Sequence, residues 1–140
     1  MVFDPGLKPG NVLRNEDITN IFGCSPQGGM RRSHKTNTLV LISNHDKLNN
    51  PNNDRWIGSI FHYTGMGKKG DQSLEYNQNK TLLNSSSEKD LGVFLFEVFE
   101  PKKYTYIGEV ELAGKPYQEK QRDTNNKIRN VWIFPLKIKR

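Results

Sequence analysis

The sequence predicts a single, mostly β domain (α+β) with one or two short helices. Its 140 residues suffice for one compact domain with a hydrophobic core but are too few for two ordinary domains. Several runs rich in β-branched and aromatic residues are separated by turn-forming residues, whereas one segment carries helix signals. We therefore expect residues 1–140 to form one mainly β domain, which belongs to a longer protein.

The helix is predicted over residues 16–22. Asn15 suits the N-cap position, because the two acids that follow it place negative charge in the first helical turn. Three apolar residues then recur at helical spacing, and Gly23 provides the residue at which such a helix ends.

The strands are predicted from short apolar runs bounded by turn residues. Within the fourth run Tyr106, Val110 and Leu112 share one face, as the two-residue period of a strand requires. Because strands of this number close on themselves or pack as two sheets, a barrel is expected. The predicted strands are residues 38–43, 56–64, 93–99, 104–112 and 131–138.

Three polar stretches are too long to be hairpin turns: residues 24–37, 44–55 and 65–90. Loops of this length are uncommon in compact domains and tend to be functional, so we expect the binding residues there. The asparagine-rich part, residues 49–53, is equally explained as a solvated surface loop.

The composition excludes several classes of protein. The single cysteine, Cys24, excludes an intrachain disulfide, and the three histidines lack the spacing of a zinc motif, so no metal or cofactor is expected. No apolar run exceeds four residues, and no export signal is present. We therefore expect a cytoplasmic protein with no membrane partner. The net charge of +6 suits a polyanion such as nucleic acid.

The most informative segment is the end of the second predicted strand, which reads Tyr-Thr-Gly-Met-Gly over residues 63–67. The glycines allow the backbone to approach a ligand closely, and Tyr63 offers a flat aromatic face. An Asp-Gln pair at 71–72 and the sequence Asn-Gln-Asn-Lys-Thr-Leu at 77–82 follow. Together these motifs resemble the SRA (SET- and RING-associated, YDG) domain family, which recognises modified cytosine.

Other segments run in the family's order, so the resemblance covers about residues 8–138. They are Pro-Gly-Asn-Val-Leu-Arg-Asn at 9–15, Gln-Gly-Gly-Met at 27–30 and Leu-Val-Leu-Ile-Ser-Asn-His-Asp at 39–46. The arrangement looks most similar to bacterial SRA domains attached to HNH-type endonucleases, which act in restriction of modified DNA.

The resemblance implies a PUA-like, SRA-type twisted β-barrel that binds duplex DNA by flipping 5-methylcytosine or 5-hydroxymethylcytosine out of the helix. It implies a binding module without catalytic residues, in the cytoplasm of a bacterium. Any DNA cleavage would belong to another domain, such as a C-terminal nuclease.

The family's pocket maps onto one group of residues. Tyr63 matches one stacking aromatic, and His45 falls where the family has the opposing tyrosine. Asp54 matches the acid that accepts a hydrogen bond from the N4 amino group of cytosine; alternatively, it is an exposed acid of a turn. The remaining pocket residues have three roles. Thr64 and Gly65 offer backbone groups to the base, Ser43 and Asn44 lie on the strand that enters the pocket, and Met66 lies beside the C5 substituent.

Two loops are expected to hold the opened duplex. Gln27 falls where the family inserts a residue into the gap left by the base, and basic residues on both loops are candidates for phosphate contacts or are simply solubilising charges. The predicted DNA-binding residues are Gln27, Arg31, Arg32, Lys68, Lys69 and Lys80.

Two alternative functions remain open from the residues. A PUA-like RNA-binding module would have the same basic surface, and would prefer single-stranded RNA to modified duplex. A small enzyme is the other alternative: Ser43, His45 and Asp54 could imitate a hydrolytic triad, although no strained turn presents the serine. A nuclease would instead need metal-binding acids or histidines, and the HNH set is not recognisable.

Overall fold

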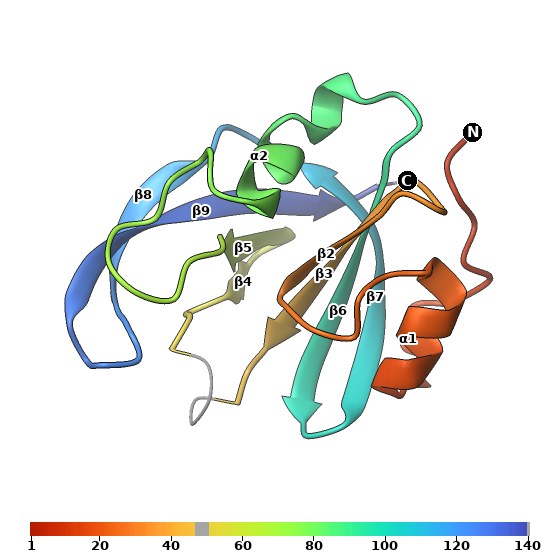
Figure 1. Ribbon diagram of the computed structural model, residues 1–140, viewed down its shortest axis with the longest axis horizontal. Helices are drawn as coiled ribbons and strands as arrows, with labels where there is room; N and C mark the ends of the chain where they lie inside the picture. The colour runs from red at the N-terminus through yellow and green to blue at the C-terminus, as the bar shows by residue number, and fades with distance from the viewer. Residues whose placement is uncertain (47–50, 140) are drawn as a thin grey trace.

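The computed structural model describes residues 1–46 and 51–139 (Figure 1). It contains two α-helices, α1 (Asn15–Phe22) and α2 (Gln78–Leu83), and a 3-10 helix, η1 (Ser85–Ser87). The predicted mostly β class with short helices is confirmed. The strands are β1 (Val12–Leu13), β2 (Met30–Ser33), β3 (Thr38–Asn44), β4 (Arg55–Ile57), β5 (Ile60–Thr64), β6 (Gly92–Glu100), β7 (Lys103–Leu112), β8 (Tyr117–Arg122) and β9 (Ile128–Ile138).

The strands form one twisted sheet in the order β2-β3-β6-β7-β9-β5-β4, with β1 paired to β7 and β8 paired to β9. Over the described residues this path does not return to its start, so the sheet is not a ring of hydrogen-bonded strands. One pair, β3 with β6, is parallel and places Leu41 beside Leu95; the other pairs are antiparallel.

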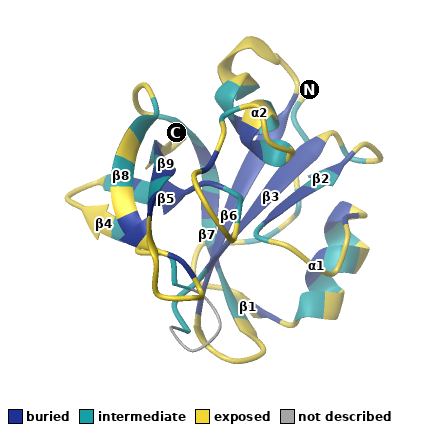
Figure 2. Ribbon diagram, turned by 60° about the vertical axis from the view of Figure 1, so that its left-hand side comes forward, coloured by how far each residue is buried: buried dark blue, intermediate teal, exposed yellow. Residues whose placement is uncertain are grey.

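The central parallel strands are buried on both faces (Figure 2). Alternate residues of β3 and β6 face two different hydrophobic clusters, which is why both strands are continuous apolar runs. On one face Val40 and Phe94 pack against α1 through Phe22. On the other face, residues of β5, β9 and α2 complete the main core: Phe61, Tyr63, Phe134, Leu136 and Leu82.

The local structure differs from the sequence-based predictions in the second predicted strand and at the start of the helix. Residues 56–64 do not form one strand but belong to the β4–β5 hairpin, in which Ile57 pairs with Ile60. The chain turns between them at Gly58, which has a left-handed φ of 61°. Helix α1 begins one residue earlier than expected, with Arg14 at the N-cap. There the Asp17 carboxylate accepts from the Arg14 backbone N–H at 3.0 Å.

The predicted long loops also contain regular structure. Strand β2 lies within residues 24–37, and α2 and η1 lie within 65–90. A parallel pair of strands requires a crossover connection. The chain between β3 and β6 is this connection, and it contains most of the predicted site residues. No helix in the described part of the chain has the length and apolarity that a membrane crossing requires.

Candidate nucleic-acid interface

Asp54 lies at the centre of a group of predicted pocket residues that the fold brings together. It directly precedes β4 and is 8% exposed, so the alternative of an exposed turn acid is wrong. Its Oδ2 accepts from the Ser43 hydroxyl of β3 at 2.6 Å. Its Oδ1 accepts from the backbone N–H of Thr64, the last residue of β5, at 2.7 Å. Three segments distant in sequence therefore converge on one carboxylate.

The environment of the Asp54 carboxyl acts on its proton affinity in two directions. Burial raises its pKa above the ordinary value, because desolvation disfavours the charged form. The hydrogen bonds from Ser43 and Thr64 oppose this effect. Each carboxylate oxygen has more than one acceptor direction, so Asp54 can accept a further hydrogen bond from an amino group presented to it.

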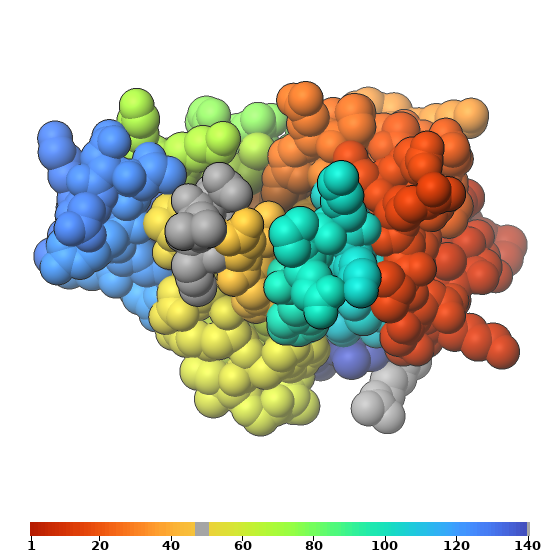
Figure 3. All heavy atoms as spheres, turned by 90° about the horizontal axis from the view of Figure 1, so that it is seen from below, coloured from red at the N-terminus to blue at the C-terminus, as the bar shows by residue number. Residues whose placement is uncertain are grey.

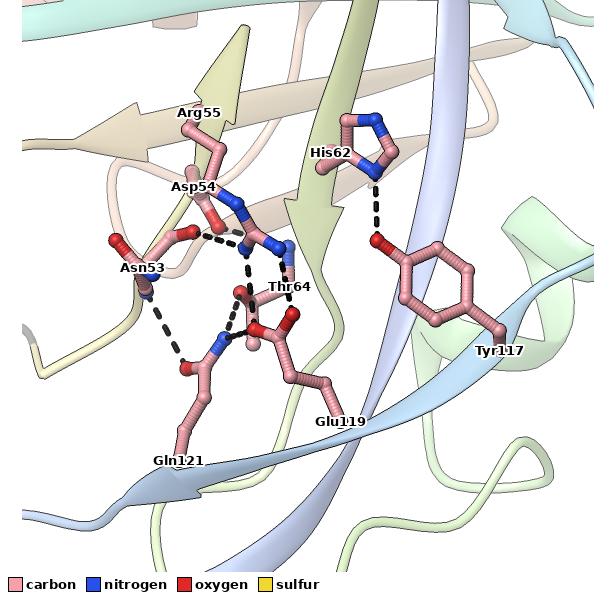
Figure 4. A network of polar contacts seen from close by, with 8 residues as sticks. All are labelled: Asn53, Asp54, Arg55, His62, Thr64, Tyr117, Glu119 and Gln121. Atoms are coloured by element: carbon pink, nitrogen blue, oxygen red, sulfur yellow. Dashed lines mark hydrogen bonds and ion pairs between the residues drawn. The ribbon is translucent and has the colours of Figure 1, made fainter. Parts of the chain in front are cut away.

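Strand β8 supports this group from the side, as Figure 4 shows. Gln121 accepts from the Asn53 backbone N–H and donates to the Thr64 hydroxyl, both at 3.3 Å. Arg55 donates to both carboxylate oxygens of Glu119, at 3.1 and 2.5 Å. These contacts tie the segment that carries the acid to the end of β5. The sequence pattern missed them, because β8 has almost no apolar residues and carries no strand signal.

Tyr63 lies in the core and is 3% exposed. Its hydroxyl is 2.7 Å from the Gly29 carbonyl oxygen and 3.3 Å from that of Ile42. Burial raises the pKa of this phenol well above its usual range. Tyr63 thus connects β5 to the loop before β2, the first loop predicted to contact DNA, and its stacking on a base stays a prediction.

His45 follows β3 and is partly buried. Its backbone N–H donates to the Val98 carbonyl at 2.8 Å, and its Nε2 is 2.8 Å from Glu97 Oε2. The Ser43 hydroxyl is bonded to Asp54 and not to His45, so the Ser–His–Asp order of a hydrolytic triad is not formed. The neighbouring Asn44 accepts from the Asp46 backbone N–H at 2.9 Å.

The Gly65–Met66 segment after β5 is clamped by two buried amide side chains. Gln72 donates to the Gly65 carbonyl at 2.8 Å. Asn79, from α2, bonds both the N–H and the carbonyl of Met66, at 2.6 and 3.0 Å. A Cβ on Gly65 would lie 2.8 Å from Asn79 Oδ1, so this close approach requires glycine. Two motif residues of the sequence, Gln72 and Asn79, therefore shape the strand end.

The residues predicted for the first DNA loop occupy different environments. Gln27 is exposed near the tip of the loop. Arg31 is 5% exposed and donates to Asn15 Oδ1 at 2.6 Å and to the Gly28 carbonyl at 2.9 Å, so it shapes the loop from inside. Arg32 bonds residues of the β2–β3 turn, including Asn37 Oδ1 at 2.9 Å, at the other end of that hairpin.

The second predicted DNA loop carries Lys68 and Lys69, both exposed. Arg129 of β9, which the sequence pattern missed, donates to the Gly67 carbonyl and holds this loop against the sheet. Burial lowers the pKa of the Arg129 guanidinium. Lys80 is exposed on α2, and its Nζ lies 3.4 Å from Glu75.

A family model described as the ScoMcrA-like SRA domain matches residues 9–138. The comparison with curated protein sequences gives no match.

Several solved structures have the same fold. Two of them are complexes with modified DNA, and a third is described as part of an enzyme that depends on cytosine modification. The structure "Sulfur binding domain and SRA domain of ScoMcrA complexed with phosphorothioated DNA" has a TM-score of 0.75 at 14% identity. The SUVH5 SRA–hemi-methylated CG DNA complex has a TM-score of 0.71 at 20% identity. The DNA recognition domain of the cytosine modification-dependent restriction endonuclease LpnPI has a TM-score of 0.65 at 14% identity.

The extent of these matches differs. The ScoMcrA alignment covers 94% of this chain and 40% of the other chain, so this chain corresponds to less than half of that protein fragment. The SUVH5 and LpnPI alignments each cover 99% of this chain, and 94% and 78% of the others. At these identities the likeness shows the shared fold alone.

Proposed function

We propose, because this chain belongs to the ScoMcrA-like SRA domain family, that it binds duplex DNA containing 5-methylcytosine or 5-hydroxymethylcytosine and extrudes the modified nucleotide into a pocket beside Asp54. The observation that carries this proposal is the buried Asp54 carboxylate, held by Ser43 and Thr64 where the Tyr-Thr-Gly strand ends. A preorganised acceptor in this place suits the N4 amino group of cytosine.

Extrusion of a base costs a few kcal/mol of unstacking, which contacts inside the pocket must offset. Stacking contributes roughly 1 to 3 kcal/mol per base. The proposed walls are His45, which is partly buried, and Tyr63, whose buried ring would have to be uncovered for a base to reach it. Thymine presents a carbonyl where cytosine presents the amino group, so Asp54 would repel it. Met66 lies next to the clamped Gly65 and is the residue we place beside the C5 substituent.

Outside the pocket, the proposed contacts are sequence-independent. Gln27 enters the gap that the extruded base leaves, and exposed basic residues such as Lys68, Lys69 and Lys80 neutralise phosphates. The net charge of +6 supports this part of the proposal.

We further propose that the domain targets a restriction endonuclease and does not itself cleave DNA. Two proteins of similar fold are described as a phosphorothioation-dependent and a cytosine modification-dependent restriction endonuclease. The nuclease would then reside in another part of the full-length protein, such as an HNH domain.

The first expected result is preferential binding to one class of duplex. Otherwise identical labelled duplexes with cytosine, 5-methylcytosine, 5-hydroxymethylcytosine or a single phosphorothioate linkage are titrated by fluorescence anisotropy. Because only a modified cytosine fills the pocket, the two cytosine-modified duplexes should bind at least tenfold more tightly than the plain duplex. Equal affinity for all four duplexes would reject the proposal, and tighter binding of single-stranded RNA would favour an RNA-binding module.

A second expected result concerns salt. If about 4 to 6 phosphates are contacted, the logarithm of the affinity should fall against the logarithm of the salt concentration with a slope of roughly −4 to −5. Lys68→Ala should weaken modified and plain duplexes alike and reduce the magnitude of the slope by about 1. Lys89→Ala, an exposed lysine beside η1, is the matched control and should leave the slope unchanged. An unaltered slope in Lys68→Ala would exclude the phosphate contact.

A further inference from the structure

Phe99, near the end of β6, is a large aromatic side chain that the core does not use. It is 63% exposed. Its ring is stacked on the His45 ring, with the ring centroids 4.9 Å apart and the planes inclined by 8°. One face of the imidazole is thus covered by an aromatic ring that itself remains open to solvent.

A buried acid holds this stack in place. Glu97 is 3% exposed. Its Oε2 lies 2.8 Å from His45 Nε2, and its Oε1 accepts from Trp56 Nε1 at 2.8 Å. Trp56 in turn packs on Phe61, with the ring centroids 4.9 Å apart. The three rings of His45, Trp56 and Phe99 form what we call the aromatic shelf, and the carboxylate restrains two of them.

The aromatic shelf borders the candidate pocket. Strands β3 and β6 are parallel and pair Asn44 with Val98, so the residues that follow each strand emerge at the same edge of the sheet. His45 is two residues beyond Ser43, the hydrogen-bond partner of Asp54. In the view from below, the β6–β7 turn lies beside the end of β3 (Figure 3).

The β6–β7 turn carries two exposed lysines, Lys102 and Lys103, close after Phe99. Its one acid, Glu100, lies 3.0 Å from Lys103, so residues 99–103 have a net charge of +1. Aromatic rings next to lysines are the combination that binds unstacked bases together with their phosphates.

We propose that the aromatic shelf is a second base-binding element: the open face of Phe99 stacks on a nucleobase at the step that extrusion has opened, and Lys102 contacts an adjacent phosphate. This inference rests on the proposed function, because a base becomes available for stacking only when the duplex is opened. It adds the β6–β7 turn to the two loops expected from the sequence.

The test compares Phe99→Ala, Phe99→Trp and Ile128→Ala in anisotropy titrations with the plain and the 5-methylcytosine duplex. Ile128 is the matched control, because it is an apolar side chain that is 61% exposed on β9. Phe99→Ala should weaken binding of the modified duplex about tenfold, as loss of one stacked base predicts, and should change plain-duplex binding less than twofold. Phe99→Trp should retain the wild-type affinity for the modified duplex, and Ile128→Ala should leave both affinities unchanged.

A 2-aminopurine next to the modified cytosine provides a second measurement. Its fluorescence is quenched when it stacks on a ring and rises when it is unstacked, so the complex with Phe99→Ala should be brighter than that with the wild-type protein. Unchanged affinity and fluorescence in Phe99→Ala, with a wild-type protein that prefers the modified duplex, would overturn this inference alone. A wild-type protein without that preference would overturn the proposed function and this inference with it.

Discussion

Asp54→Asn should abolish the preference for modified cytosine while leaving the protein folded. The asparagine oxygen can still accept from the Thr64 N–H, and its amide group can donate to the Ser43 hydroxyl oxygen. The change therefore replaces an acceptor by a donor on the side that we assign to the base. Loss of one good base contact is worth roughly 1 to 3 kcal/mol, so the affinity for the 5-methylcytosine duplex should fall at least tenfold. Plain-duplex binding, which depends on phosphates, should not change.

A G·T mismatch makes this experiment more specific. Thymine carries the same methyl group as 5-methylcytosine but presents a carbonyl in place of the amino group. The wild-type protein should prefer the 5-methylcytosine duplex to the mismatch, and Asp54→Asn should lose or invert this order. Acid should also weaken wild-type selectivity, because lowering the pH through the raised pKa of Asp54 protonates the carboxylate. Retention of the wild-type order in Asp54→Asn would exclude Asp54 as the residue that selects cytosine.

Asn79→Ala should be the most destabilising of the substitutions discussed, because Asn79 is fully buried and bonds the backbone of a segment distant in sequence. Its removal leaves the N–H and carbonyl of Met66 without their partners. Buried groups left unsatisfied cost about 1 to 3 kcal/mol each, so the free energy of unfolding should fall by about 3 kcal/mol. For a chain of this size this lowers Tm by about 10 °C, which thermal unfolding monitored by circular dichroism measures.

Two further variants separate the hydrogen bonds of Asn79 from helix propensity. Lys80→Ala, the exposed neighbour on α2 whose ion pair is with the exposed Glu75, should change the free energy of unfolding by less than about 0.5 kcal/mol. Asn79→Asp keeps the shape and the acceptor for Met66 N–H but cannot donate to its carbonyl, so it should also destabilise. If Asn79→Asp unfolds at the wild-type temperature, the amide clamp does not stabilise the fold.

The parts of the fold that were predictable are those with a strong apolar pattern. Strands β3, β6, β7 and β9 were predicted within a few residues, because each contributes continuous or alternating apolar residues to the core. Helix α1 was predictable from its acids, its apolar stripe and Gly23, which has a φ of 70° and donates to the Thr19 carbonyl at 2.9 Å. Strand β8 and helix α2 were not predicted, because their polar sequences are defined by tertiary pairing rather than by periodicity.

The candidate site likewise contains residues that the sequence motifs indicated and residues that only the structure revealed. Motif order singled out Asp54, Tyr63 and the Gly65 segment as candidates, and the family that this order suggested is the one to which the chain belongs. The motif could not reveal that Glu97 joins His45 to Trp56, or that Gln121 braces Thr64. These partners lie tens of residues apart and leave no spacing signal.

The amino-acid sequence alone therefore determined the class of fold, the position of the strand end and the types of side chain placed there, because these depend on local pattern and on residue chemistry. Only the tertiary structure decided that Asp54 is buried and held by two donors, that Arg31 shapes a loop from within, and that Phe99 remains open beside His45. The physical reason is that burial and hydrogen-bond partners arise from strand pairing across the sheet. The residue pattern of one segment does not reveal which distant segment pairs with it.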